Sequence, residues 1–232
     1  MSSSRWSTGA YAILDVDAFR ARGVDVSQPG VVESIAAAML EGGASMLQLR
    51  AKEESGRATL SLLRRLSPCT RAANVPLVCN DRVDLALLAD ADAVHVGQDD
   101  LPLADARAIA PRLSIGVSTH SLEQLRAALD GAPSYVAFGP VFGTTSKKRA
   151  DATVGVSLLG EAARLAAHAR VPLVAIGGVT VERAPQLVEV GVRWAAVISE
   201  LVVVDHENRP DLSAIARRTR ALSDALSTAV RV

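Results

Sequence analysis

Two polar clusters enclose a mostly apolar stretch of the sequence, NDRVDLALLADADAVHVGQDD, which runs from position 80 to position 100. Asp81 lies in the first cluster and Asp100 in the second. Mg²⁺ binds proteins through one or two carboxylates and completes its shell with water and substrate phosphates. If the clusters follow neighbouring parallel strands, the two aspartates meet, and we predict a magnesium site there. The alternative is that Asp81 caps a helix beginning near Val83 and that Asp99 or Asp100 serves a turn before Pro102.

Basic residues follow another candidate strand, in the segment QLRAKEESG. Arg50 and Lys52 are two positions apart and share a face with Gln48, because alternating positions of an extended segment point the same way. Cations beside Mg²⁺ share the charge of a pyrophosphate, so we predict a pyrophosphate site here. Lys147 in FGTTSKK would add a further positive charge. The alternative is that these cations are exposed and pair with the glutamates at positions 53 and 54.

A pair of glycines predicts a second anion site. Gly177 and Gly178 in AIGGV come just past an apolar run, where backbone N–H groups can approach a phosphate with no Cβ in the way. Ser199 in VISE offers a hydroxyl after the next run. His120 in GVSTHS is the histidine best placed for proton transfer. The alternative for His120 is that it orients its loop through one ring nitrogen.

Strands and helices must position these side chains. Short apolar runs bounded by Gly, Pro or polar residues are typical of buried strands, and segments such as VVESIAAAML have the apolar spacing of helices. Ser121 followed by Gln124 predicts a helix start, and a final amphipathic helix is expected from about Pro210. The runs are YAIL (11–14), SMLQL (45–49), PLVC (76–79), AVHV (93–96), SIGV (114–117), YVAF (135–138), PLVAI (172–176) and WAAVI (194–198).

The alternation of strands and helices predicts a single (β/α)8 barrel. A doubly wound open sheet shares this alternation and is the competing fold. Polar clusters follow nearly every run rather than a single switch point, which favours the barrel. In a barrel all of them would converge on the rim formed by the carboxyl ends of the strands.

The composition fits one domain and argues against several classes of protein. We expect a single domain over residues 1–232, with residues 1–9 as a flexible extension. Hydrophobic residues make up 49% and aromatic residues 3%, which suits close-packed parallel strands. The 25 basic and 25 acidic residues balance, which argues against bulk nucleic-acid binding. No stretch predicts a secretory signal or membrane span, and two cysteines make no disulfide framework, so we expect a cytoplasmic protein.

Seven segments resemble, in the same order, the signature segments of the thiamine phosphate synthase family. They extend from about Tyr11 to Leu201, which is most of the chain. The resemblance implies a barrel enzyme with Mg²⁺ as cofactor, which joins a pyrimidine pyrophosphate to a thiazole phosphate and forms thiamine phosphate and pyrophosphate. The segments are QLRAK, NDRVDLAL, HVGQDDLP, IGVSTHS, YVAFGPVFGTTSK, AIGGV and AVIS.

The resemblance also implies a role for each matching residue. Asp81 and Asp100 would hold Mg²⁺. The pyrimidine pyrophosphate would be bound by Gln48, Arg50, Lys52, Asn80, Ser118 and Lys147. The site for the thiazole phosphate would be lined by Thr144, Ser146, Gly178, Ile198 and Ser199. The residues expected to act in catalysis are Arg50, Lys52, Ser118 and Lys147.

One departure and two rival hypotheses remain. The family segment usually reads Thr-x-Thr-Lys, whereas Ser146 stands here in the third place and keeps the hydroxyl donor. A related thiazole tautomerase would use His120 as its acid–base residue, but it has no use for the metal site that the aspartates indicate. A non-catalytic barrel that binds a phosphorylated ligand is the third hypothesis. We expect small-molecule partners and no nucleic acid or membrane, and the sequence is compatible with a homo-oligomer.

Overall fold

Eight parallel strands form a closed barrel in which each strand pairs with its neighbours in sequence and β8 pairs with β1. The computed structural model describes residues 8–143 and 152–227. Every predicted strand is present, and closure of the sheet rules out the open doubly wound fold. The strands are β1 (Gly9–Asp15), β2 (Met46–Arg50), β3 (Leu77–Asn80), β4 (Ala93–Val96), β5 (Ser114–Thr119), β6 (Tyr135–Phe138), β7 (Leu173–Ile176) and β8 (Trp194–Val197).

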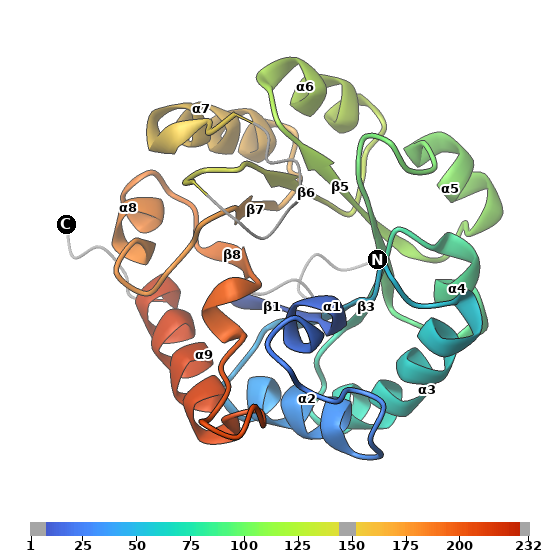
Figure 1. Ribbon diagram of the computed structural model, residues 1–232. Helices are drawn as coiled ribbons and strands as arrows, with labels where there is room; N and C mark the ends of the chain where they lie inside the picture. Colours follow the sequence, from blue (N-terminus) through green and yellow to red (C-terminus); the bar gives the residue numbers. More distant parts are fainter. Residues whose placement is uncertain (1–7, 144–151, 228–232) are drawn as a thin grey trace.

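Helices surround the barrel as an outer ring (Figure 1). Ser121 caps the sixth helix by accepting a hydrogen bond from the backbone N–H of Gln124, as predicted. The last helix begins at Leu212, two residues after the expected start. The helices are α1 (Val16–Arg20), α2 (Val31–Glu41), α3 (Gly56–Ala72), α4 (Val83–Leu88), α5 (Leu103–Ile109), α6 (Leu122–Asp130), α7 (Gly155–His168), α8 (Ala184–Glu189) and α9 (Leu212–Ser227), with a 3₁₀ turn, η2 (Ser199–Leu201), between β8 and α9.

Alternate residues of each strand face opposite sides of the barrel wall. One buried cluster packs between strands and helices and holds most of the aliphatic core. A second, smaller cluster lies inside the barrel and includes Tyr11, Tyr135 and Trp194. Because side chains alternate with a period of two, the inward set continues up each strand to its carboxyl end. The same alternation therefore directs Gln48 toward the interior, where its side chain is buried.

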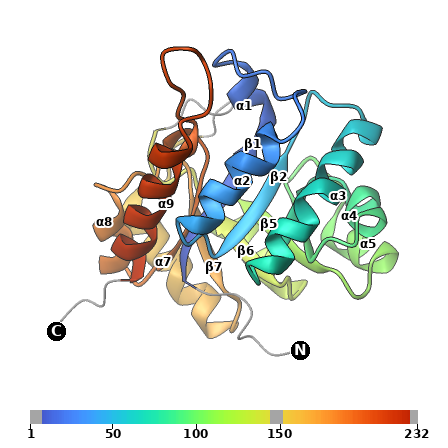
Figure 2. The same cartoon turned by 90° about the horizontal axis from the view of Figure 1, so that it is seen from below.

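The strand register sets which residues meet at the rim. Asp15, the last residue of β1, pairs in register with Arg50, the last residue of β2. Asn80 at the end of β3 pairs with His95 in β4. Figure 2 shows α1 at one end of the barrel, close to the loop that leads into α9.

Two sequence expectations concern the ends and the hydropathy of the chain. β1 begins at Gly9, so this residue belongs to the barrel and not to the extension expected over residues 1–9. Among the residues that the structure describes, no helix is both long enough and apolar enough to cross a bilayer.

Candidate active site at the carboxyl rim

Asp81 follows β3 and lies at the centre of a charged cluster. Its carboxylate is 3.0 Å from the ammonium nitrogen of Lys52, which extends from the loop after β2. The capping alternative is wrong for Asp81, because Arg82 occupies the N-cap position of α4 and no side chain caps that helix. Asp81 instead has a left-handed backbone, with φ of 61°. This conformation is uncommon for a residue with a Cβ and is typical of tight functional turns.

Asp100 approaches Asp81 from the turn after β4. Its Oδ2 accepts a hydrogen bond of 2.7 Å from the backbone N–H of Gly97, so the turn role that the sequence allowed is present. Burial raises the pKa of Asp81, Lys52 opposes this shift, and the neighbouring Asp100 reinforces it. A nearby positive charge favours the ionised form of both carboxylates, and Lys52 supplies one beside Asp81. The described residues contain no group of three or more His, Cys, Asp or Glu side chains that could hold a metal. Any metal at this place would therefore have two carboxylates of the described chain as its ligands.

Arg50 is held by Asp15, a residue that the sequence analysis missed. Its guanidinium forms an ion pair with the Asp15 carboxylate, and the Asp15 side chain is only 3% exposed. The same carboxylate caps α1 by accepting hydrogen bonds of 3.1 Å from the backbone N–H groups of Asp17 and Ala18. The period-two alternation of β1, which puts Asp15 on the same face as Tyr11, could have revealed it.

Hydrogen bonds from its backbone to α1 hold the loop after β2 in place. Asp17 accepts hydrogen bonds of 2.8 Å and 3.2 Å from the backbone N–H groups of Lys52 and Glu53. Glu54 pairs with Arg20 of α1. The alternative of exposed cations paired with the glutamates at 53 and 54 is wrong for Arg50, which is largely buried and paired with Asp15. Lys52 is half exposed, as that alternative has it, but its ammonium pairs with Asp81.

Inside the barrel, five buried polar side chains form a continuous chain of hydrogen bonds. It begins at Gln48, passes through both tyrosines, and ends at Ser118. His95 lies in the interior, and both its ring nitrogens take part in the chain. Burial raises the pKa of both phenols, so they keep their protons at neutral pH. Gln48 and Ser118 thus lie at the two ends of one network on opposite sides of the barrel interior.

The glycine turn after β7 packs closely on the loop after β6. Gly178 has a φ of 62°, and a Cβ there would lie 2.5 Å from the carbonyl oxygen of Gly143. Arg183 donates a hydrogen bond of 2.6 Å to the carbonyl of Gly178, and its guanidinium lies 4.9 Å from the ring centroid of Phe142. Arg183 therefore fastens the two loops together. The sequence analysis did not single it out, because nothing in the spacing links it to the glycines.

The remaining candidates occupy separate positions on the rim. Ile198 is half-buried after β8, and the exposed Ser199 opens the turn η2. His120 donates a hydrogen bond of 2.6 Å from Nδ1 to the carbonyl oxygen of Gly139, which fits the loop-orienting alternative. Three predicted site residues lie outside the described part of the chain, so their positions stay predictions: Thr144, Ser146 and Lys147.

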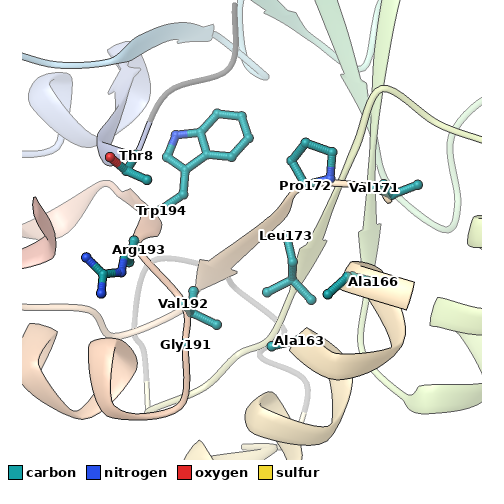
Figure 3. A pocket seen from close by; sticks show the side chains of 11 residues that line it. Thr8, Ala163, Ala166, Val171, Pro172, Leu173, Gly191, Val192, Arg193 and Trp194 are labelled. Carbon is teal, nitrogen blue, oxygen red and sulfur yellow. The ribbon is translucent and has the colours of Figure 1, made fainter. Parts of the chain in front are cut away.

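A pocket of about 310 Å³ lies away from this rim, where β7 and β8 begin (Figure 3). It is lined mainly by aliphatic side chains from α7 and from the segments that lead into β7 and β8. Of the described residues that line it, only Arg193 is charged. Conserved chemistry in barrels sits at the opposite, carboxyl end of the strands, so this hollow is no candidate for the reaction.

Comparisons with known proteins agree on one family. A family model described as thiamine monophosphate synthase matches residues 25–201. The chain is 41% identical to the thiamine-phosphate synthase of Chloroflexus aurantiacus over 91% of both chains. It is 47% identical to that of Roseiflexus castenholzii over 81% of this chain and 78% of the relative. A solved structure of thiamine phosphate pyrophosphorylase from Pyrococcus furiosus superposes with a TM-score of 0.79 and 30% identity, covering 96% of this chain and 97% of the other.

Proposed function

Because this chain belongs to the thiamine monophosphate synthase family, we propose that its carboxyl rim carries out the thiamine phosphate synthase reaction. The chain is a transferase of thiamine biosynthesis. The reaction joins 4-amino-2-methyl-5-(diphosphomethyl)pyrimidine to 4-methyl-5-(2-phosphoethyl)thiazole and releases pyrophosphate. The observation that carries the proposal is the cluster of Lys52, Asp81 and Asp100 at the ends of β2, β3 and β4.

Asp81 and Asp100 would hold Mg²⁺. Their fit to the ion rests on two close carboxylates, one of them with its pKa raised by burial and by its acidic neighbour. Hard oxygen donors of this kind suit Mg²⁺, which takes few protein ligands and leaves room for substrate phosphates. When bound, the ion supplies positive charge to the leaving pyrophosphate.

Arg50, Lys52, Asn80 and Lys147 would bind the pyrophosphate. The ion pair with Asp15 supports this role for Arg50, because a guanidinium carries five N–H donors in a fixed fork. One carboxylate occupies part of that fork and fixes its orientation, which leaves donors for phosphate oxygens. Lys52 is half exposed, with its ammonium beside Asp81, so it can reach a phosphate bound at the same carboxylates.

The two organic halves would bind on either side of this centre. Gln48 and Ser118, whose side chains are buried in the barrel mouth, would contact the pyrimidine substrate. The tight turn at Gly178 supports a phosphate site, since only a residue without a Cβ fits there. The thiazole phosphate would be bound by Gly178, Ile198 and Ser199, together with Thr144 and Ser146.

The reaction asks little acid–base chemistry of the protein. Departure of pyrophosphate leaves positive charge on the pyrimidine methylene, and the ring amino group delocalises it. The thiazole nitrogen then attacks and becomes quaternary, so it has no proton to lose. The protein's task is to position the reactants and to stabilise the leaving group. Arg50, Lys52, Ser118 and Lys147 are the groups proposed to do this in contact with the pyrimidine substrate.

The proposal is tested by following both products with purified protein. Thiamine phosphate and pyrophosphate should form in equal amounts when both substrates and Mg²⁺ are present. A chelator should stop the reaction and added Mg²⁺ should restore it. Omission of either substrate is the control, since neither product should then accumulate. Product formation that continues in chelator would contradict the metal site, and no product under any condition would contradict the synthase assignment.

Three properties stay predictions from the sequence. They are the single domain over residues 1–232, the cytoplasmic location, and the compatibility of the chain with a homo-oligomer.

A further inference from the structure

The buried chain of hydrogen bonds inside the barrel links two proposed substrate contacts that come from different strands. Gln48 Nε2 lies 2.6 Å from the hydroxyl oxygen of Tyr11. That oxygen is 2.9 Å from the hydroxyl oxygen of Tyr135, which is 3.0 Å from Nδ1 of His95. Nε2 of His95 is 2.8 Å from Oγ of Ser118. Strands β2, β1, β6, β4 and β5 each contribute one link, and Tyr11, Tyr135 and His95 have no part in the reaction described above.

The direction of the chain follows from the Gln48 end. Gln48 donates through its amide nitrogen, which cannot accept a hydrogen bond. Tyr11 therefore accepts from Gln48, and it donates its own proton to Tyr135. A buried hydroxyl whose proton had no acceptor would destabilise the fold by the full cost of removing that group from water. Each later group then accepts from one neighbour and donates to the next, which makes Nδ1 of His95 an acceptor.

A neutral imidazole with an acceptor at Nδ1 carries its proton at Nε2. His95 then donates to Oγ of Ser118, and the hydroxyl proton of Ser118 is directed away from the histidine. The chain thus fixes three things together: the orientation of the Gln48 amide, the tautomer of His95, and the Ser118 hydroxyl as a donor toward the substrate.

Packing holds the chain rigid. A Cβ at Gly116 would lie 2.0 Å from the Tyr135 ring, so glycine at this position is what admits the ring to the interior. Trp194 stacks on Tyr11, with ring centroids 5.8 Å apart and planes 26° apart. Its ring centroid is 5.3 Å from that of Tyr135. The rings therefore have little freedom to move, and a hydrogen-bonded side chain in such a layer keeps one rotamer.

We propose that Tyr11, Tyr135 and His95 are positioning residues, which orient Gln48 and Ser118 toward the pyrimidine substrate through one directed hydrogen-bond chain. This inference rests on the proposed function for the roles of Gln48 and Ser118. The direction of the chain is a property of the free protein and does not rest on it.

The first test reads the tautomer of His95 by ¹⁵N NMR of the imidazole nitrogens in the substrate-free protein near neutral pH. The His95 signals are assigned from their loss in His95→Gln. Protonated Nε2 and unprotonated Nδ1 are expected. Protonation at Nδ1 would overturn the proposal, whether or not the protein makes thiamine phosphate. The Tyr135→Phe variant should show a mixture of tautomers, because the group that donates to Nδ1 has been removed.

The second test is kinetic and compares Tyr135→Phe and Tyr11→Phe with Thr119→Val. Thr119→Val is the control, because it removes a buried hydroxyl next to Ser118. The Thr119 hydroxyl donates a hydrogen bond of 2.9 Å to the carbonyl of Ala137 and takes no part in the hydrogen-bond chain. In both Phe variants kcat/KM for the pyrimidine pyrophosphate should fall about ten-fold or more, because small errors in the position of reacting groups slow a reaction strongly. The KM for the thiazole phosphate should stay within about two-fold, and Thr119→Val should match the wild type.

A double-mutant cycle separates positioning from general stability. Tyr11 acts through Gln48, so Tyr11→Phe should add less than about two-fold to the loss already caused by Gln48→Ala. Full additivity of the two losses would mean that Tyr11 does not act through Gln48 and would overturn the proposal. Equal kcat/KM for the wild type and both Phe variants would overturn it too. An inactive wild-type protein would instead contradict the proposed function, and the NMR result would still decide the direction of the chain.

Discussion

At the scale of single residues, the site depends on side chains that each serve two neighbours. Asp15 caps α1 and also pairs with Arg50. Asp100 accepts from the Gly97 N–H and faces Asp81. Lys52 is fixed through its backbone by Asp17 and through its side chain by Asp81. Such shared contacts preorganise the charges before a substrate arrives, and this lowers the cost of binding a polyanion.

Asp15→Asn separates the two tasks of Asp15. Asparagine caps helices about as well as aspartate does, so α1 should keep its start. The charged partner of Arg50 is lost, and a charge-assisted hydrogen bond contributes about 1.5–3 kcal/mol. We expect a fall of about ten-fold or more in kcat/KM for the pyrimidine pyrophosphate, measured by steady-state kinetics.

The matched control for this change is Asp25→Asn. Asp25 accepts a hydrogen bond of 3.1 Å from the backbone N–H of Ser27 and serves only a local turn. This control should leave kcat/KM unchanged. Arg50 would not depend on Asp15 if Asp15→Asn behaved like the control.

Contacts between individual side chains are what the sequence predicts least well. Asp81 and Asp100 could be singled out in the sequence because each lies in the polar cluster that follows an apolar run. The left-handed backbone that turns Asp81 away from α4 depends on tertiary contacts and has no local signal. Tyr11 and Tyr135 looked like strand residues only, since their pairing joins positions 124 apart in the chain. Side-chain networks of this kind are specified by the closed barrel and not by spacing.

At the scale of elements, the turn after β7 and the loop after β6 act as one unit. Phe142 donates its backbone N–H to Gly177 at 3.0 Å, and Arg183 at the start of α8 reaches back to Gly178. Through these contacts Arg183 couples the start of α8 to the loop after β6, so a phosphate bound at the glycine turn would meet a loop that Arg183 helps to hold.

Arg183→Met tests this coupling. Methionine keeps an unbranched chain of similar length over Phe142 but cannot donate to the Gly178 carbonyl. We expect KM for the thiazole phosphate to rise about five-fold or more, with the KM for the pyrimidine pyrophosphate unchanged, because a hydrogen bond from a charged donor is lost. Arg193→Met, in the pocket at the other end of the barrel, is the control. An equal effect on both substrates would point to a general disturbance of the barrel and contradict the coupling.

The elements themselves were predicted well, for a physical reason. Each strand is a short apolar run because both its faces are buried, and each ends in polar residues because the rim meets solvent. All eight runs overlap their strands, including SIGV, which lies within β5. The register across the barrel could not be predicted, because it arises when the sheet closes. Register decides that Asp15 lies beside Arg50.

At the scale of the whole molecule, the barrel separates stability from chemistry. The cluster between strands and helices supplies most of the buried aliphatic surface. The interior carries a small aromatic layer whose two tyrosines also belong to the polar chain, and the charged residues lie at the rim. The pocket in Figure 3 lies at the opposite end, and among its lining residues in the described part of the chain only Arg193 is charged. Changes in the outer helices should therefore alter stability more than specificity.

The carboxylates after β3 and β4 are proposed to hold the metal with which the pyrophosphate binds. The most direct measurement is the initial rate of thiamine phosphate formation by Asp81→Ala at saturating Mg²⁺ and substrates. Asp84→Ala is the matched control, because Asp84 lies three residues away on α4 and pairs only with the exposed Arg82. We expect a loss of about a hundred-fold or more for Asp81→Ala and a rate close to wild type for Asp84→Ala. Equal rates for the two variants would contradict this proposal.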